Sequence, residues 1–171
     1  MRRPLAVFAF FVIFCALAVP CHAHSSAEWE KRLADSTATI WVEGQDLGGI
    51  ILNARAEINV TRLDRKMADF LNQDRDVDEW VVEGLNYYYS NRKDVKARVK
   101  NNEVFVVRCR ANKFFEFAPE KLVINGRALR KEDVLTNAIY WESEMNAGDE
   151  FIITVLAPAT PRGQKTEASY D

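Results

Sequence analysis

The sequence predicts a mainly β protein, built as an antiparallel, immunoglobulin-like sandwich of about eight strands with one or two short helices. Two observations support this prediction. Apolar and polar residues alternate along several short runs of the chain, which is the period of a half-buried strand. Turn-forming residues separate these runs at intervals of about 8–12 residues, a spacing typical of such a sandwich.

The first elements are expected to be a helix, a long strand and a second helix. Residues 24–36 place Trp29 and Leu33 at helical spacing, which predicts one short helix packed on the body of the domain. Every second residue is apolar in 50–60, which predicts a single long half-buried strand. A helix is predicted over 61–72, because this run opens with residue types that begin helices and keeps one face apolar.

A hairpin is predicted in residues 94–109. Apolar and basic residues alternate before Asn101 and Asn102, which occupy the turn, and an extended pattern resumes from Val104 to Cys109. A three-residue loop pairs Val99 with Phe105 and places the apolar residues of both strands on one face, so we predict this register. The apolar face then consists of Val95, Ala97, Val99, Phe105, Val107 and Cys109.

More short strands are predicted in the remainder of the chain, one of which turns at Asn125 and Gly126. The last residues, 158–171, are polar and have no periodicity, which predicts a disordered tail. The expected organisation is one β-rich domain over 24–157 followed by this tail. The additional strands are predicted at 115–117, 122–124, 139–141 and 151–156.

The first residues have the pattern of a cleavable secretory signal peptide over 1–23, in which two arginines precede an apolar run. That run, about 15 residues long, is shorter than the roughly 20 needed to span a bilayer, so no transmembrane anchor is expected. Cys21 could instead be the lipidated first residue of a lipoprotein, but Pro20 stands where such signals have a small residue. We therefore expect an extracytoplasmic protein, periplasmic or secreted, without lipid at Cys21.

The composition of the remaining chain excludes several classes of function. The formal net charge of −2 becomes more negative when the two signal-peptide arginines are removed, which argues against nucleic acid as a partner. Once the signal peptide is removed, Cys109 is the one remaining cysteine and His24, at the new N-terminus, the one remaining histidine. This excludes an internal disulfide, a Ser-His-Asp triad and a histidine zinc site. Cys109 lies on an apolar strand face, so we expect it to be buried.

An enzyme built on this chain would have to use carboxylates, lysine or tyrosine. Glu142 and Glu144 are candidates, but they alternate along the chain as residues of an ordinary exposed strand edge also do. We therefore expect no catalytic site.

Two short patterns resemble parts of metal sites without completing them. With His24 at the mature N-terminus, the chain resembles the beginning of the copper brace of secreted copper oxygenases and related copper carriers. Those families supply a second, internal histidine, which this chain lacks.

Asp74, Asp76 and Asp78 resemble the start of a calcium loop, but Glu79 stands where that loop requires glycine. We expect no metal and no other cofactor.

The predicted hairpin defines a candidate docking surface, because its register gathers basic residues and two valines on the face opposite the apolar one. One interpretation is a solvated outer face neutralised by nearby carboxylates. The other is a docking surface for an acidic partner or an anionic glycan. We predict a non-catalytic interaction domain that docks to a protein partner in the envelope or extracellular space through an open sheet face. The predicted partner-binding residues are Lys96, Arg98, Val104, Val106, Arg108 and Arg110.

The alternative function is a module that binds a carbohydrate or another cell-surface polymer. Its binding residues would be Trp80, Tyr87, Tyr88 and Tyr89, because aromatic faces stack on sugars, although such residues also pack cores and strand edges. The sequence leaves open the identity of the partner, the oligomeric state and whether Asn59, in a glycosylation acceptor, is modified.

Overall fold

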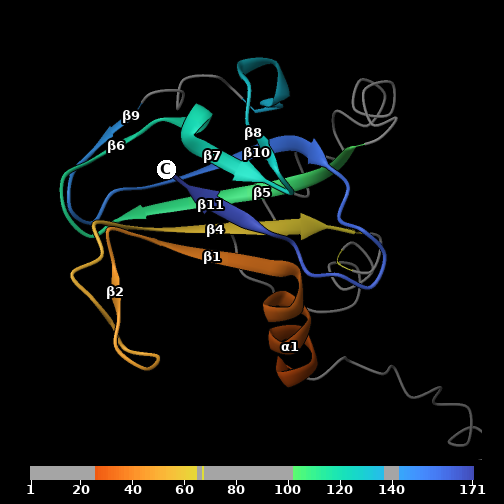
Figure 1. Ribbon diagram of the computed structural model, residues 1–171, viewed down its shortest axis with the longest axis horizontal. Coiled ribbons are helices and arrows are strands. Elements are labelled where there is room, and N and C mark those ends of the chain that lie inside the picture. Colours follow the sequence, from red (N-terminus) through yellow and green to blue (C-terminus); the bar gives the residue numbers. More distant parts are fainter. Residues whose placement is uncertain (1–25, 65–66, 68–101, 137–142) are drawn as a thin grey trace, which may run out of the picture.

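The largest sheet has the strand order β1-β4-β5-β10, and every pairing in it is antiparallel (Figure 1). The computed structural model of the chain describes residues 26–64, 67, 102–136 and 143–171. Over these residues the protein is mainly β, with antiparallel sheets and one α-helix, as the sequence predicted. The strands of this sheet are β1 (Thr37–Val42), β4 (Ala56–Leu63), β5 (Asn102–Ala111) and β10 (Glu150–Pro158).

Helix α1 (Ser26–Ser36) leads directly into β1 and confirms the first predicted helix. Glu28 lies in its first turn, where the helix dipole favours a negative charge. The Trp29 side chain is buried, with 3% of its surface exposed, and Leu33 is half-buried. The helix therefore packs through the apolar face that the spacing of these two residues predicted.

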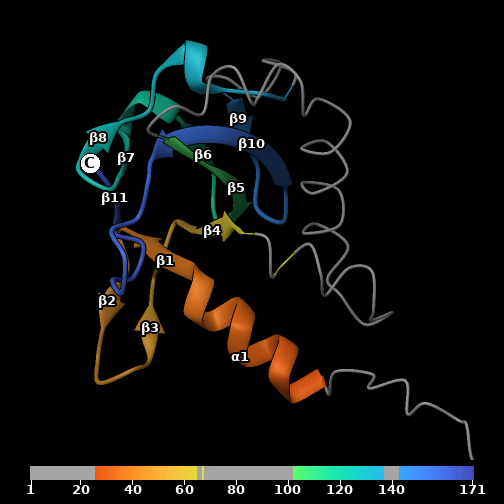
Figure 2. The ribbon, with the colours of Figure 1, turned by 90° about the vertical axis from the view of Figure 1, so that its right-hand side faces the viewer.

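The hydrophobic core lies on one face of the four-stranded sheet. Alternate residues of β4 and β5 enter it, and Ile58, Phe105 and Cys109 are completely buried there, which confirms the prediction for the cysteine. Smaller strands pack across this face and complete the core (Figure 2). They are β6 (Phe115–Phe117), β7 (Leu122–Ile124), β9 (Ser143–Met145) and β11 (Ala168–Tyr170), and β8 (Arg127–Ala128) pairs with β7.

The long strand predicted over 50–60 is divided in the structure. Its first part is β3 (Ile51–Leu52), which pairs with β2 (Gln45–Asp46) in a projecting hairpin. Asn53 then adopts a left-handed conformation, with φ of 60°, and ends β3. The chain resumes as β4, which keeps the predicted alternation. The alternation of apolar and polar residues therefore runs on from β3 to β4, although the backbone conformation of Asn53 separates the two strands.

The predicted hairpin register is wrong. Phe105 pairs with Arg62 of β4 on one side and with Val155 of β10 on the other, so both of its edges are occupied and Val99 cannot pair with it. The assignment of faces within β5 is nevertheless right, because Phe105 and Cys109 enter the core. Alternation specifies which residues share a face, but it does not identify the neighbouring strand.

The second helix does not begin where the sequence predicted. Thr61 belongs to β4, where it is buried and its hydroxyl lies 2.8 Å from that of Thr37. The Asp64 carboxylate accepts a 2.9 Å hydrogen bond from the amide of Met67, three residues later, as an N-cap side chain does. The rest of 61–72 beyond these residues lies outside the described part of the chain.

The turn predicted at Asn125 and Gly126 is confirmed. Both residues have positive φ, 48° and 78°, as the two central residues of a type I′ hairpin turn require. The Asn125 side chain also reaches the C-terminal segment: its amide donates to the Pro158 carbonyl (2.7 Å) and the Thr160 hydroxyl (3.1 Å), and its oxygen accepts the Glu167 amide (3.0 Å).

The prediction of a disordered tail over 158–171 is therefore wrong. This segment returns to the domain and ends in β11, which pairs with β7 from Ala168 to Tyr170. Its order depends on side-chain hydrogen bonds from Asn125 and on one aromatic residue, Tyr170, which packs against the core. Apolar periodicity does not register contacts of these kinds.

Asn125→Gly should lower the free energy of unfolding by about 2 kcal/mol, because it preserves the left-handed turn and removes three side-chain hydrogen bonds. Urea denaturation measures this change. The matched control is Asn53→Gly, which alters another left-handed asparagine whose side chain makes no such bonds in the described residues and should change stability by less than about 0.5 kcal/mol. Equal effects of the two substitutions would contradict the role given to Asn125.

Several predicted features lie outside the described residues. They include the signal peptide over 1–23, the N-terminal His24, the acidic cluster over 74–79, the first hairpin strand over 94–100 and the strand over 139–141. In the part of the chain that is described, no helix is both long enough and apolar enough to cross a membrane.

Candidate binding groove

The structure buries part of the predicted docking face. Val104 and Val106 lie on the face of β5 that points away from the main core, but only 4% and 0% of their surfaces are exposed. The prediction that these valines are apolar contacts for a partner is therefore not supported by their position. They lie on a central strand whose two faces are both covered at this point.

The described arginines of the same face have acidic neighbours. The half-buried Arg108 donates to the carboxylate of the exposed Glu150 at 2.7 Å. Arg110 is exposed and lies between Glu57 of β4 and Glu150 of β10 in the strand register. These carboxylates offset the positive charge, so the described part of this face offers little attraction to an acidic partner.

The other candidate residues cannot be placed. Lys96 and Arg98 lie outside the described residues, as do Glu142 and the aromatic residues proposed for sugar binding, Trp80 and Tyr87 to Tyr89. Glu144 is described: it is exposed on β9, directly opposite Glu116 of β6.

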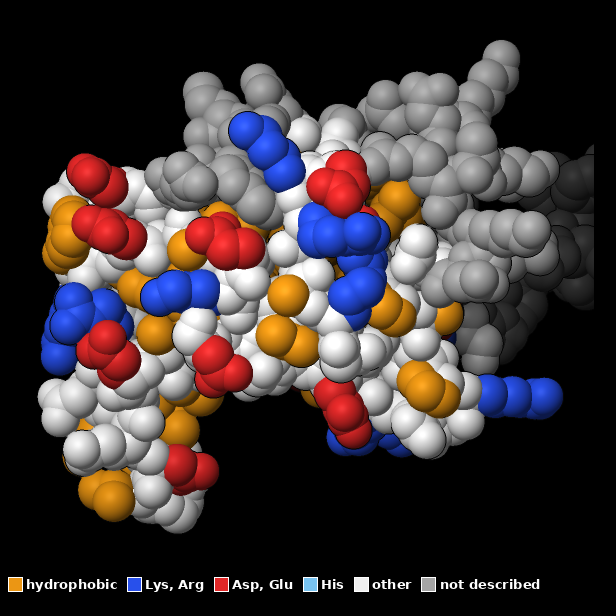
Figure 3. All heavy atoms as spheres, turned by 45° about the horizontal axis from the view of Figure 1, so that its top comes forward, with side chains coloured by type: hydrophobic (Ala, Val, Ile, Leu, Met, Phe, Trp, Pro, Cys, Tyr) orange, Lys and Arg blue, Asp and Glu red, His pale blue; other side chains and the backbone are white. Residues whose placement is uncertain are grey.

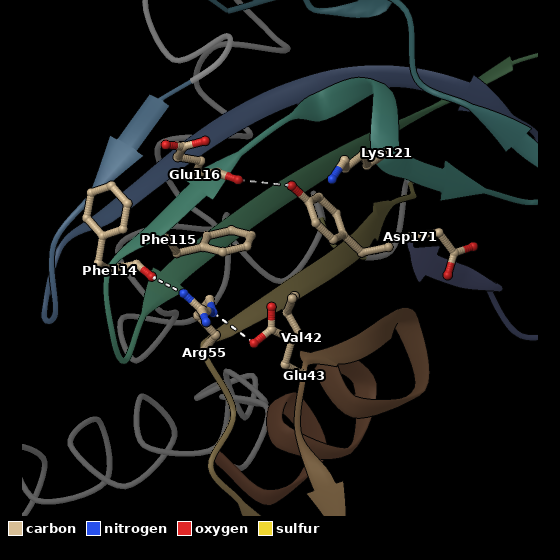
Figure 4. Close-up of a pocket in the computed structure, with 9 residues that line it drawn as sticks. Val42, Glu43, Arg55, Phe114, Phe115, Glu116, Lys121 and Asp171 are labelled. Atoms are coloured by element: carbon tan, nitrogen blue, oxygen red, sulfur yellow. Dashed lines mark hydrogen bonds and ion pairs between the residues drawn. The ribbon is translucent and has the colours of Figure 1, made fainter.

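A groove of about 540 Å³ lies beside β6, as Figure 4 shows. Its walls come from segments far apart in the sequence: the end of β1, Arg55 before β4, β6 with the preceding Phe114, Lys121 and the end of β11. Lys121 closes the short 3₁₀ helix η1 (Pro119–Lys121), which joins β6 to β7.

One edge of β6 faces this groove. Its other edge pairs with β9, with Phe115 opposite Met145 and Phe117 opposite Ser143. The backbone of a strand directs the N–H and C=O groups of successive residues to opposite edges. The even-numbered residues of this segment therefore direct their backbone groups into the groove.

Hydrogen bonds at three consecutive even positions support this assignment. The Phe114 carbonyl accepts a 3.2 Å hydrogen bond from Arg55 Nη1, and the Glu116 carbonyl accepts a 3.3 Å hydrogen bond from the Tyr170 hydroxyl. The Ala118 amide donates to the same hydroxyl at 2.8 Å. The Glu116 N–H also points into the groove. No group in the described residues accepts a hydrogen bond from it there.

Aromatic side chains form the floor of the groove. Phe115 is buried, and its ring lies 5.6 Å from that of Tyr170, which also stacks on Phe117 at 5.9 Å. Burial raises the pKa of Tyr170 above its ordinary value, so its hydroxyl keeps the proton that it donates to Glu116. In Figure 4 the Phe115 ring extends across the groove, whereas the Phe114 ring points away from it.

The charged side chains are at the rim. Arg55 Nε donates to the Glu43 carboxylate at 2.9 Å, and Glu43 has a positive φ of 54°, which costs a non-glycine residue about 1–2 kcal/mol. Lys121, Glu116 and Asp171 complete the rim. The described residues contain no group of three His, Cys, Asp or Glu side chains that could hold a metal ion. A free backbone edge above an apolar floor suits the binding of a chain segment.

A second exposed surface is the β2–β3 hairpin. Leu47 and Ile50 flank its Gly48-Gly49 turn and expose 61% and 65% of their surfaces. Figure 3 shows acidic, basic and apolar side chains intermixed on the face that it presents, and apolar side chains at the end of the lobe at lower left, where Figure 1 places the hairpin. Nothing in the structure indicates what would cover this tip.

Comparisons of the chain with family models, with curated proteins and with solved structures found no match. The function proposed below therefore depends on the groove and on the chemistry of the residues that line it.

Proposed function

We propose that this protein is a non-catalytic extracytoplasmic interaction domain, and that the groove beside β6 is where it binds a protein partner. The observation that supports this function is the edge of β6 that pairs with no strand of the described residues, where the Glu116 N–H lies over an apolar floor. The apolar run that precedes His24 supports the extracytoplasmic location. The proposed architecture is an immunoglobulin-like sandwich, since a single core separates the four-stranded sheet from the smaller strands.

The groove replaces the sheet face of the sequence prediction as the proposed contact site. On that face the valines are buried and the described arginines have acidic neighbours, whereas the groove combines unpaired backbone, apolar surface and balanced charge. Sugar binding remains the alternative, through Trp80 and the three tyrosines. The groove itself favours a peptide, because its floor ring, Phe115, is only 5% exposed and cannot offer a whole face for stacking.

A photo-crosslinking amino acid at position 114, which is half exposed beside the groove, should form an adduct with a protein from the envelope or secreted fraction of the host. The matched control carries the same amino acid at Lys131, which is exposed on η2 (Lys131–Asp133) and does not line the groove. Mass spectrometry identifies the adducts. The absence of an adduct, or the same adducts at both positions, would overturn the proposed site.

A further inference from the structure

We propose that the partner binds by strand addition: an extended peptide segment pairs with the free edge of β6 at Glu116, with a basic residue opposite this glutamate and apolar residues on either side. This inference rests on the proposed function and specifies its binding mode. The position of Glu116 supports it, because its backbone groups face the groove while Phe115 and Phe117 pair with β9.

Glu116 can form a complete residue pair with an added strand. Its N–H has no acceptor on the groove side among the described residues, and its carbonyl oxygen has a second lone pair besides the one used by the 3.3 Å bond from Tyr170. An incoming residue can therefore accept from the N–H and donate to the carbonyl, the two bonds exchanged by a hydrogen-bonded pair in an antiparallel sheet. Neither bond requires Tyr170 to leave.

The two ends of the groove limit the length of the added segment. Arg55 occupies the Phe114 carbonyl at one end, and the Tyr170 hydroxyl occupies the Ala118 amide at the other. A long strand would have to displace both side chains. The geometry therefore favours a short segment, centred on the residue that pairs with Glu116.

Charge specifies the central residue of the segment. Glu116 lies directly opposite Glu144 of β9, and like charges in such a pair are unfavourable. An incoming strand would place its central side chain on the other flank of Glu116, in the same row across three strands. A lysine or arginine at that position would lie next to Glu116, whose carboxylate already faces that of Glu144 on its other side, so the row favours a basic residue there.

The floor of the groove specifies the flanking residues. Side chains alternate between the two faces of a strand, so the residues before and after the central one point toward the same side as Phe115. On that side they would meet the half-buried side chains of Val42 and Tyr170, which pack beside the buried Phe115. The expected ligand is therefore an extended peptide with the pattern apolar, basic, apolar.

The test uses a random twelve-residue peptide library displayed on phage, selected on the full domain. Enriched peptides should share this pattern, and one of them is then synthesised for binding measurements. Glu116→Pro removes the N–H that faces the groove and leaves the partners of β9 intact, as proline at an outward-facing edge position can. It should weaken peptide binding at least tenfold relative to Glu116→Gln, which removes the same charge and keeps the N–H. Equal binding by the two variants, or no enriched peptide, would overturn strand addition.

Hydrogen exchange on the unaltered protein provides a second measurement, in case the proline variant fails to fold. Saturating peptide should slow exchange of the Glu116 amide at least tenfold and leave the amides of Phe115 and Phe117, which face β9, unchanged. An unchanged Glu116 rate would contradict the inference. If an adduct forms at position 114 but these two tests fail, the groove remains the contact site and only the binding mode is wrong.

Discussion

Phe117→Ala should lower the free energy of unfolding by about 3–5 kcal/mol, the range found when a fully buried aromatic residue is truncated. The Phe117 ring is 1% exposed, contacts Phe151 edge to face with the ring centroids 4.6 Å apart, and stacks on Tyr170. Removing it takes away hydrophobic burial and leaves a cavity under the groove. Urea denaturation followed by circular dichroism measures the loss.

The matched control is Phe114→Ala, three residues earlier in the same segment. Phe114 is 50% exposed, so its truncation should cost less than about 1 kcal/mol while altering the rim of the groove. Similar losses for the two phenylalanines would show that Phe117 does not occupy the packed core described above.

Alkaline pH should destabilise the domain through Cys109. Burial, and secondarily the nearby charge of Glu150, raise the pKa of this thiol from 9.0 to about 12. The unfolded chain therefore loses the thiol proton before the folded domain does, so stability is fully present below pH 9 and falls as pH rises toward 12. Between pH 9 and pH 11 the loss from Cys109 should be about 2 kcal/mol.

The measurement compares urea denaturation of the unaltered protein and Cys109→Ala at pH 8 and pH 11. The raised pKa of Tyr170 adds a loss of the same sign above pH 10, but its largest cause, burial, is common to both proteins. The alanine variant should start less stable, because a buried side chain is shortened, and then lose about 3 kcal/mol less on going to pH 11. Parallel losses in the two proteins would contradict a buried, protonated thiol.

Local patterns predicted the elements that depend on local chemistry. The helix around Trp29, the turn at Asn125 and the burial of Cys109 follow from spacing, turn propensity and alternation. What was missed depends on residues distant in the chain. The neighbours of Phe105 are set by which strands meet in space, and the order of the C-terminal segment is set by the side-chain bonds of Asn125.

The candidate groove escaped prediction for a related reason. Arg55 and Phe114 meet at its rim although they are 59 residues apart, and its central group is a backbone N–H, which every residue except proline possesses. The segment around Phe115 was correctly predicted as a strand. Its residue types do not reveal which edge is left unpaired, or that two side chains limit the length of that edge.

The order of strands in the main sheet also affects how the domain reaches its native state. β4, β5 and β10 are adjacent in space, yet the chain runs from Leu63 to Asn102 and then from Ala111 to Glu150 before each next strand can join. Every such pairing closes a long loop, whose entropy is lost before contacts are gained. We therefore expect the formation of the central β5 contacts to be a slow step in folding, during which the apolar residues of this strand are exposed to other chains.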